Sequence, residues 1–211
     1  MRIGVIGSGN IGSTTARLLA GAGHEVSIAN SRGPETLSDL VEEIGENASA
    51  ATVEEAASFG EAVLVAIPLG VYRDLPAEAL SGRVVIDAMN YYSSRDGNIA
   101  ELDDGSMTSS ELLAAHAPQA KVVKAFNTMN WRLLRDRGKP GGGDDRLAIF
   151  LAGDDPEAKT LVAGLIDDIG FAPVDTGSLA EGGRRQQPGS PIYGEPVTES
   201  EGRGVLEGMD D

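Results

Sequence analysis

A glycine-rich turn at residues 7–12 has the spacing of a phosphate-binding loop. Its residues, Gly7-Ser8-Gly9-Asn10-Ile11-Gly12, follow the pattern G-x-G-x-x-G between an apolar run, Arg2–Ile6, and an amphipathic stretch. The first glycine permits a tight turn, the second lets the backbone approach a pyrophosphate, and the third allows close helix packing. The N-terminus of the following helix attracts negative charge. In this context the motif predicts a dinucleotide site, and the alternative is a structural turn without a ligand.

The end of the second predicted strand, about 20 residues further on, distinguishes the two nicotinamide dinucleotides. An NAD site normally has Asp or Glu there, accepting hydrogen bonds from the ribose. This chain has Asn30-Ser31-Arg32 instead, and a hydroxyl with a guanidinium can bind a 2′-phosphate. The residues therefore favour NADP over NAD. The nearby Glu35 weakens the local positive field. The alternative interpretation of Arg32 is an ordinary surface residue that binds no ligand.

Residues for other kinds of chemistry are sparse. The chain has no Cys, and Tyr91 is followed four positions later by Arg95 rather than Lys, so no Tyr-x-x-x-Lys dyad is present. Asp87 ends a strand and could either orient a ligand hydroxyl or stabilise a turn. We expect no metal site, because adjacent carboxylates diverge in direction. The adjacent acidic pairs are Asp103-Asp104, Asp144-Asp145, Asp154-Asp155 and Asp167-Asp168.

Short apolar runs alternate with helical patterns, which is typical of parallel βαβ units. We therefore expect an α/β fold with a doubly wound, mostly parallel sheet and helices on both faces. Residues 1–176 form the nucleotide-binding domain in this interpretation, and residues 177–211 are an irregular C-terminal loop and tail packing over it. The predicted strands are 2–6, 25–29, 48–51, 62–67, 83–87, 121–126, 147–152 and 172–175, and the predicted helices are 10–22, 34–44, one after Thr52, 108–118 and 155–169.

The acidic composition limits the classes of partner. The 33 Asp and Glu against 17 Lys and Arg give a net charge of -16, which argues against nucleic acid and anionic membrane surfaces. The first residues lack a basic region followed by an apolar one, so we expect no signal peptide and a cytoplasmic protein. A small-molecule ligand is the expected partner.

Several stretches together resemble the NADP oxidoreductase, coenzyme F-420-dependent family (coenzyme F-420 is F420 below). The Asn-Ser-Arg element and Lys-Ala-Phe-Asn-Thr are its more specific parts. The matching stretches are 3–12 (IGVIGSGNIG), 23–34 (GHEVSIANSRGP), 66–69 (AIPL), 84–90 (VVIDAMN), 121–129 (KVVKAFNTM) and 150–156 (FLAGDDP).

The resemblance implies a single Rossmann domain that holds NADPH across the strand ends and passes hydride to a flavin-like acceptor. Such chemistry needs aligned rings rather than a catalytic acid or base. No catalytic side chain is therefore expected, and Asn127, Thr128 and Met129 are the implied nicotinamide neighbours. The implied cofactor-binding residues are Gly7, Ser8, Gly9, Asn10, Ile11, Gly12, Asn30, Ser31, Arg32, Ile67, Pro68, Leu69, Asn90 and Ala125.

Two departures from the family pattern concern the acceptor. Asn130-Trp131 stands where F420-using members have a Pro and a small residue, so Trp131 could occupy the acceptor's space, stack on an acceptor or simply be buried. We expect the tail over the active site, with the alternative of a solvated loop. The candidate acceptor-pocket residues are Tyr91, Trp131, Arg184, Arg185 and Tyr193. The resemblance also suggests a homodimer.

The expected function is an NADPH-dependent oxidoreductase acting on F420 or another flavin-like acceptor. One alternative is an NADP(H)-binding redox sensor or accessory module without its own acceptor site. A second alternative is a reductase of a small carbonyl or imine, for which the sequence shows no evident proton donor.

Overall fold

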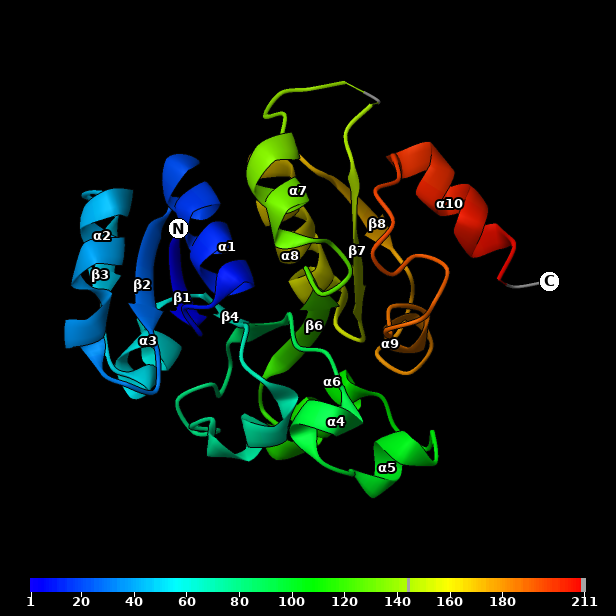
Figure 1. Cartoon of the computed structure of the whole chain (residues 1–211), viewed down its shortest axis with the longest axis horizontal. Coiled ribbons are helices and arrows are strands. Elements are labelled where there is room, and N and C mark those ends of the chain that lie inside the picture. Colours follow the sequence, from blue (N-terminus) through cyan, green and yellow to red (C-terminus); the bar gives the residue numbers. More distant parts are fainter. Residues whose placement is uncertain (144, 210–211) are drawn as a thin grey trace.

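Eight strands join into one sheet in the computed structural model, which describes residues 1–143 and 145–209 (Figure 1). Their order across the sheet is β3-β2-β1-β4-β5-β6-β7-β8, and all neighbouring pairs are parallel except β6 and β7. The strands are β1 (Arg2–Ile6), β2 (Glu25–Ala29), β3 (Ala48–Ala50), β4 (Ala62–Val65), β5 (Val84–Asp87), β6 (Lys121–Ala125), β7 (Ala148–Gly153) and β8 (Ala172–Asp175). The predicted fold class is confirmed.

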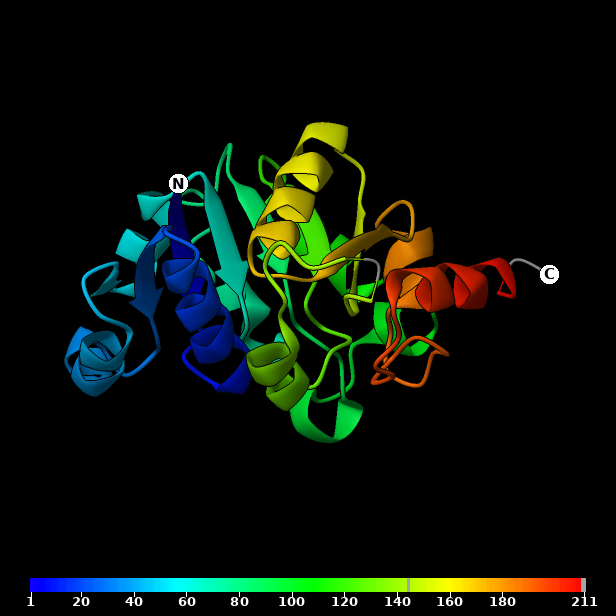
Figure 2. The same cartoon turned by 90° about the horizontal axis from the view of Figure 1, so that it is seen from above.

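Helices cover both faces of this sheet, as the view from above shows (Figure 2). Capping boxes begin α3 at Thr52 and α6 at Thr108, the two positions where the sequence predicts helices to start. The helices are α1 (Asn10–Gly21), η1 (Pro34–Leu37), α2 (Ser38–Ile44), α3 (Val53–Phe59), η2 (Leu69–Asp74), α4 (Ser93–Asp96), α5 (Ala100–Asp103), α6 (Ser109–His116), α7 (Trp131–Arg137), α8 (Pro156–Asp168), α9 (Glu181–Arg185) and α10 (Glu199–Glu207).

Alternating strand residues build two separate cores, one on each face. In β4, Ala62 and Leu64 belong to the cluster that α1, α7 and α8 cover, whereas Val63 and Val65 belong to the cluster under α3 and α6. Because both faces are covered, central strands are apolar at every position rather than at every second one. All four residues of β4 are buried.

The chain changes direction across the sheet between β1 and β4. From β1 it adds β2 and β3 on one side, and it then returns to place β4 on the other side of β1. In open α/β sheets, ligands bind at such a switch point, outside the carboxyl ends of the strands. The glycine-rich turn leaves β1 at this point.

The antiparallel β7 brings the C-terminal segment to the same edge. Its last residues pair with the last residues of β6, as in Ala125 with Leu151 and Val123 with Gly153. The two strands β7 and β8 therefore extend past the carboxyl edge of the parallel strands, and the segment after β8 begins at that edge. The backbone N–H of Gly194 donates to the carbonyl of Thr128, 2.8 Å away, which ties this segment to the end of β6.

The segment after β8, expected to be irregular, contains two helices. One of them, α10, begins with a capping box at Thr198 that the sequence analysis missed, and its Gly202 lies against the ring of Phe150 in β7. Figure 1 shows α9 and α10 beside β7 and β8. Asp144, a member of one of the adjacent acidic pairs, and residues 210 and 211 of the predicted tail lie outside the described residues.

Candidate functional site

The turn after β1 has the geometry that its glycines predict. Gly7 has φ of 113°, and a side chain there would lie 2.3 Å from the carbonyl oxygen of Ala66. A side chain on Gly12 would lie 1.8 Å from the carbonyl oxygen of Gly7, so helix α1 requires a glycine to pack this closely. Gly9, in contrast, faces open space, and no side chain caps the first turn of α1. The turn therefore leaves its backbone N–H groups available to an anion.

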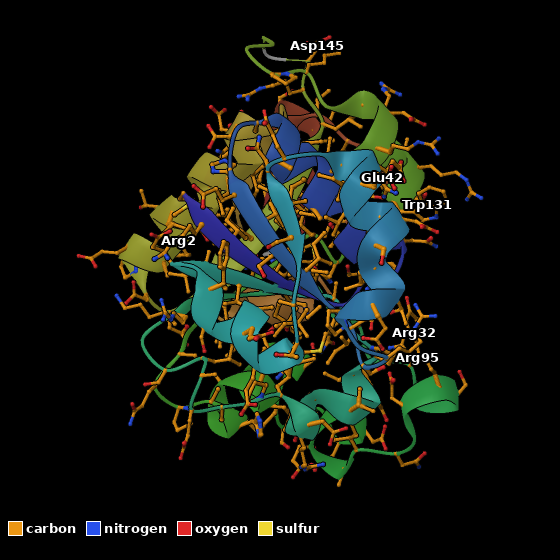
Figure 3. The ribbon with its side chains drawn as sticks, turned by 90° about the vertical axis from the view of Figure 1, so that its left-hand side faces the viewer. Arg2, Arg32, Glu42, Arg95, Trp131 and Asp145 are labelled. Atoms are coloured by element: carbon orange, nitrogen blue, oxygen red, sulfur yellow. The ribbon has the colours of Figure 1, made fainter. Side chains whose placement is uncertain are left out.

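Asn30 connects this turn to the end of β2. Its Nδ2 donates to Ser8 Oγ at 3.2 Å, and its Oδ1 accepts from the backbone N–H of Arg32 at 2.8 Å. The guanidinium of Arg32 is exposed and has no hydrogen bond or ion pair among the described residues. Figure 3 shows Arg32 at the end of this strand. Asn30 thus fixes the backbone around Arg32, while the charged group stays available to a ligand.

The end of β4 is held by a buried carboxylate. Leu69, which begins η2, is buried, and the next N–H, of Gly70, donates to Asp96 Oδ1 at 3.2 Å. Burial of this carboxyl opposes its ionisation, but hydrogen bonds from Arg95, Tyr92 and Gly70 outweigh burial and lower the pKa of Asp96. Arg95 also donates to the carbonyl of Asn90 at 2.6 Å. Asp96 and Arg95 therefore hold the segments after β4 and β5 together.

The turn after β6 is strained and directs Asn127 into the site. Phe126 has φ of 67°, the only positive value for a non-glycine residue in the described ranges, and it is buried. Such a conformation costs about 1–3 kcal/mol for a bulky residue, so the surrounding packing must enforce it. Asn127 Nδ2 donates to Asn90 Oδ1 at 3.1 Å and to the carbonyl of Gln186 at 2.8 Å. Asn127 Oδ1 is buried without a hydrogen-bond partner.

Beside Asn90 lies a cavity of about 120 Å³ whose wall includes a buried lysine. Its lining residues are Asn90, Tyr91, Leu102, Ser109, Lys124, Gln187 and Pro188. Lys124 Nζ lies 3.3 Å from Asp87 Oδ2, and both side chains are fully buried. The ammonium also donates to Ser109 Oγ and to the carbonyl of Met89, each at 3.1 Å. The cavity therefore combines a charged pair with a hydroxyl at the carboxyl ends of β5 and β6.

The structure brings Tyr91 to this cavity, whereas the predicted acceptor-pocket residues Arg184, Arg185 and Tyr193 are not among its lining residues. The Tyr91 hydroxyl donates to Asp103 Oδ1 at 2.6 Å, and this hydrogen bond raises the pKa of Tyr91. The hydroxyls of Tyr193 and Tyr92 lie 2.5 Å apart, and burial, followed by this contact, raises the pKa of Tyr193. Arg184 and Arg185 each donate to a backbone carbonyl, those of Gly105 and Thr176.

Trp131 lies away from the cavity, in a groove between α1 and α7. That groove also contains Asn10, Arg17 and Glu43, and the guanidiniums of Arg132 and Arg135 lie 4.7 and 5.2 Å from the indole ring. Figure 3 shows Trp131 apart from Arg32 and Arg95. Trp131 is not among the residues lining the Tyr91 cavity.

Several groups at or near the cavity are not predicted by the sequence, among them the lining residue Ser109. Lys124 was assigned only to a strand, and Gln186, which is fully buried and has an unpartnered Oε1, to the tail. The signal for Lys124 is a lysine within the otherwise apolar run KVVKAF, one strand away from Asp87. No feature of the sequence indicates Gln186. It reaches the carboxyl edge of the sheet because β7 is antiparallel, and the sequence does not reveal that direction.

Some other kinds of site find no support in the part of the chain that the structure describes. No group of three or more His, Asp or Glu side chains could hold a metal ion within residues 1–143 and 145–209. Over the same residues, no helix has the length and apolar character needed to cross a membrane.

The comparisons with known proteins agree with this geometry. The family model described as NADP oxidoreductase coenzyme F420-dependent matches residues 2–91. The crystal structure of a hypothetical protein from Sinorhizobium meliloti is 33% identical, with a TM-score of 0.81, covering 94% of this chain and 95% of that one. A protein from an Arthrobacter species, named as a candidate F420-dependent NADP reductase, is 31% identical with a TM-score of 0.71, covering 86% and 88%.

A longer relative shows the same similarity over part of its length. Metalloreductase STEAP3 of Rattus norvegicus is 31% identical over 182 residues, or 85% of this chain. The match covers 34% of that relative, so the chain spans about a third of its length.

The fold and site define a Rossmann-type nucleotide-binding oxidoreductase. The chain belongs to the family described as NADP oxidoreductase coenzyme F420-dependent.

Proposed function

We propose that this protein transfers hydride between NADP(H) and a deazaflavin, coenzyme F420, or another flavin-like acceptor. The observation that carries the proposal is the Oδ1 atom of Asn127, a buried acceptor without a partner beside the cavity at the carboxyl edge. A buried polar atom normally has a partner, so this one indicates a ligand with a hydrogen-bond donor. The carboxamide of nicotinamide carries such a donor.

The described residues fit NADP(H) along the whole carboxyl edge. The uncapped first turn of α1 would hold the pyrophosphate, Ser31 and Arg32 the 2′-phosphate, and Asn127 the nicotinamide carboxamide. The bound dinucleotide supplies the hydride. The protein's part is to fix the nicotinamide ring, through the Asn90–Asn127 pair, against an acceptor on the side of the Tyr91 cavity, and to keep water out.

The size of the cavity supports a second candidate, a small carbonyl or imine as acceptor. At about 120 Å³ it is comparable to the engineered cavity of about 150 Å³ that holds benzene. It therefore accommodates one ring or a small group rather than a whole tricyclic deazaflavin. A deazaflavin would place only one edge in it, whereas a small carbonyl or imine would fit entirely.

A panel of acceptors tests the proposal. We would measure NADPH oxidation under anaerobic conditions with F420, FMN, FAD, a quinone, a small ketone and a cyclic imine, each with wild type and with Asn127→Ala. We expect F420 or FMN to be reduced, and Asn127→Ala to reduce them more slowly. Reduction of the ketone or imine alone would favour the second candidate. If NADPH binds but no acceptor is reduced, the hydride-transfer proposal is wrong and a redox-sensing or accessory role is favoured.

A further inference from the structure

Reduction of a C=N or C=O group requires a proton as well as a hydride, and the cavity wall contains a source for it. We infer that Ser109 donates this proton to the heteroatom of the acceptor and is reprotonated by Lys124. The inference rests on the proposed function, because it concerns the acceptor of the same hydride. It adds a catalytic residue, Ser109, and a positioning pair, Lys124 and Asp87, where the sequence showed no proton donor.

Lys124 and Ser109 both line the cavity, and the ammonium of Lys124 is held by partners within the protein. Its three hydrogens have three acceptors: Asp87 Oδ2 at 3.3 Å, the carbonyl of Met89 at 3.1 Å and Ser109 Oγ at 3.1 Å. The lysine side chain has no exposed surface. Because the three ammonium hydrogens are already bonded within the protein, the Ser109 hydroxyl is the group that donates to a ligand in the cavity, and Lys124 resupplies its proton.

Ser109 has a free proton to give. Its Oγ accepts from Lys124, but its own hydroxyl hydrogen has no acceptor among the described residues. The side chain is 4% exposed and lines the cavity, so a heteroatom bound there would be its natural acceptor. The neighbouring Ser110 differs, because its hydroxyl donates to Asp87 Oδ2 at 2.5 Å and is already used.

Asp87 makes the transfer reversible. Its Oδ1 accepts from the N–H of Met89 at 2.9 Å, and its Oδ2 accepts from Ser110 and Lys124, so the carboxylate is fixed and fully buried. A buried carboxylate favours a cation beside it. After Lys124 has given up a proton, Asp87 therefore favours its return to the ammonium form.

The step balances in atoms and electrons. The electrophilic carbon of the acceptor receives the hydride, which carries two electrons, from the nicotinamide. The π electrons move to the nitrogen or oxygen, which takes the hydroxyl proton of Ser109. Ser109 takes a proton from Lys124, and the resulting neutral amine recovers one from water when the product leaves. The sum is acceptor, NADPH and H⁺ giving reduced acceptor and NADP⁺.

Ser109→Ala tests the inference while keeping both members of the charged pair. It removes the hydroxyl but leaves both Lys124 and Asp87, and the capping box of Thr108 and Glu111 still begins α6. The matched control is Ser106→Ala, an exposed serine three residues earlier whose hydroxyl donates to the carbonyl of Glu101. We would measure kcat with F420, or with whichever acceptor of the panel is reduced, together with the Kd of NADPH.

A second readout does not depend on turnover. The chain has only four lysines, Lys121, Lys124, Lys139 and Lys159, so selective ¹³C labelling gives few signals, and a Lys124→Arg variant assigns the one of interest. With NADP⁺ and oxidised F420, a pair that cannot react, the Lys124 signal should shift in wild type and in Ser106→Ala. In Ser109→Ala the shift should be clearly smaller, because the hydrogen bond that links Lys124 to the ligand is lost, and the other three lysines serve as internal references.

We expect Ser109→Ala to lower kcat by about 100-fold or more, as the loss of a general acid does, with the Kd of NADPH unchanged within twofold. A kcat within twofold of wild type, or a Lys124 signal that does not respond to a bound acceptor, would overturn the inference and leave the proposed function standing. An equal loss in kcat and NADPH affinity would indicate a merely structural role and would also overturn it. If wild type reduces no acceptor, the proposed function fails, and this inference falls with it.

Discussion

At the scale of single residues, the ion pair of Lys124 and Asp87 has an energetic cost as well as a proposed role. Both side chains are fully buried, and removing two charges from water costs several kcal/mol per ion. Their attraction and the hydrogen bonds from Ser110 and Met89 offset that cost. A pair of this kind adds little to stability over an apolar pair, so its presence beside a cavity is better explained by chemistry.

We therefore expect a single substitution in this pair to destabilise the fold more than a double substitution that removes both charges. Lys124→Met should lower the free energy of unfolding by about 3–5 kcal/mol, because it leaves the Asp87 carboxylate buried without its cation. The double variant Lys124→Met with Asp87→Leu should recover most of that loss, since neither charge remains. Denaturant unfolding monitored by circular dichroism measures both. Equal destabilisation of the single and double variants would contradict this account of the pair.

Asn127 provides a second test at this scale. Asn127→Ala should weaken NADPH binding by about 0.5–1.5 kcal/mol, or up to roughly tenfold, because it removes the acceptor proposed for the carboxamide. We would use isothermal titration calorimetry with NADPH and with 2′-phospho-ADP-ribose, which lacks the nicotinamide. The comparison separates the loss of a nicotinamide contact from a general effect on the fold. The second ligand should bind wild type and variant alike, and an equal loss for both would show that Asn127 acts only through the fold.

Some of these residues were predictable from the sequence, and the reason is local geometry. The glycine spacing and the Asn30–Arg32 element could be read directly, because each lies in one short turn whose backbone the residues themselves determine. The strained Phe126 could not be predicted, since a bulky residue gives no sign of a positive φ. The role of Lys124 depends on partners on β5 and α6, which only the assembled sheet brings within reach.

At the scale of elements, Asp96 of α4 joins the segments that follow β4 and β5. Its hydrogen bonds lower its pKa below the ordinary value of about 3.9. A carboxyl whose pKa is lowered in the folded state stabilises the fold above its unfolded pKa, and the stabilisation is lost as the pH falls through the folded pKa. Asp96→Asn should therefore lower the melting temperature at pH 7, and this difference should shrink as the pH falls below the ordinary carboxyl pKa.

The control for this prediction is Asp39→Asn, at an exposed position on α2. Melting temperatures of wild type, Asp96→Asn and Asp39→Asn, measured between about pH 3 and pH 7, test whether the charge of Asp96 stabilises the fold. A difference between wild type and Asp96→Asn that is constant over this range would show that the charge of Asp96 contributes nothing.

The elements themselves were predicted unevenly. All eight strands lie within about two residues of their predicted bounds, because continuous apolar runs are a strong signal for covered strands. The helices α4, α5, α7, α9 and α10 were not predicted; the first four have no more than seven residues, and the nine-residue α10 lies in the Gly- and Pro-rich segment expected to be irregular. A helix as short as the first four has too few turns for a hydrophobic periodicity to be recognised in the sequence. The antiparallel direction of β7 was also missed, since an apolar strand looks the same in either direction.

At the scale of the whole molecule, the net charge of -16 leads us to expect that added salt changes stability and ligand affinity in opposite directions. Surface carboxylates repel one another in the folded chain, so screening them should raise the melting temperature. Binding of NADPH should weaken over the same range, because salt screens the Arg32 guanidinium from the 2′-phosphate. Differential scanning calorimetry and fluorescence titration from low salt to about 1 M, where the Debye length is about 3 Å, should show both trends. NADPH affinity that rises with salt would indicate that the general negative field, rather than Arg32, dominates at the site.

The central claim is that the end of β2 selects NADP(H) through Arg32, whose guanidinium has no partner among the described residues. The most direct test is the Kd of NADPH and of NADH for wild type, Arg32→Glu and the control Arg137→Glu, an exposed arginine on α7. Loss of a charge-assisted contact costs about 1.5–3 kcal/mol, so Arg32→Glu should weaken NADPH by about tenfold or more and leave NADH and the control unchanged. An NADPH Kd within twofold of wild type in Arg32→Glu would contradict the account.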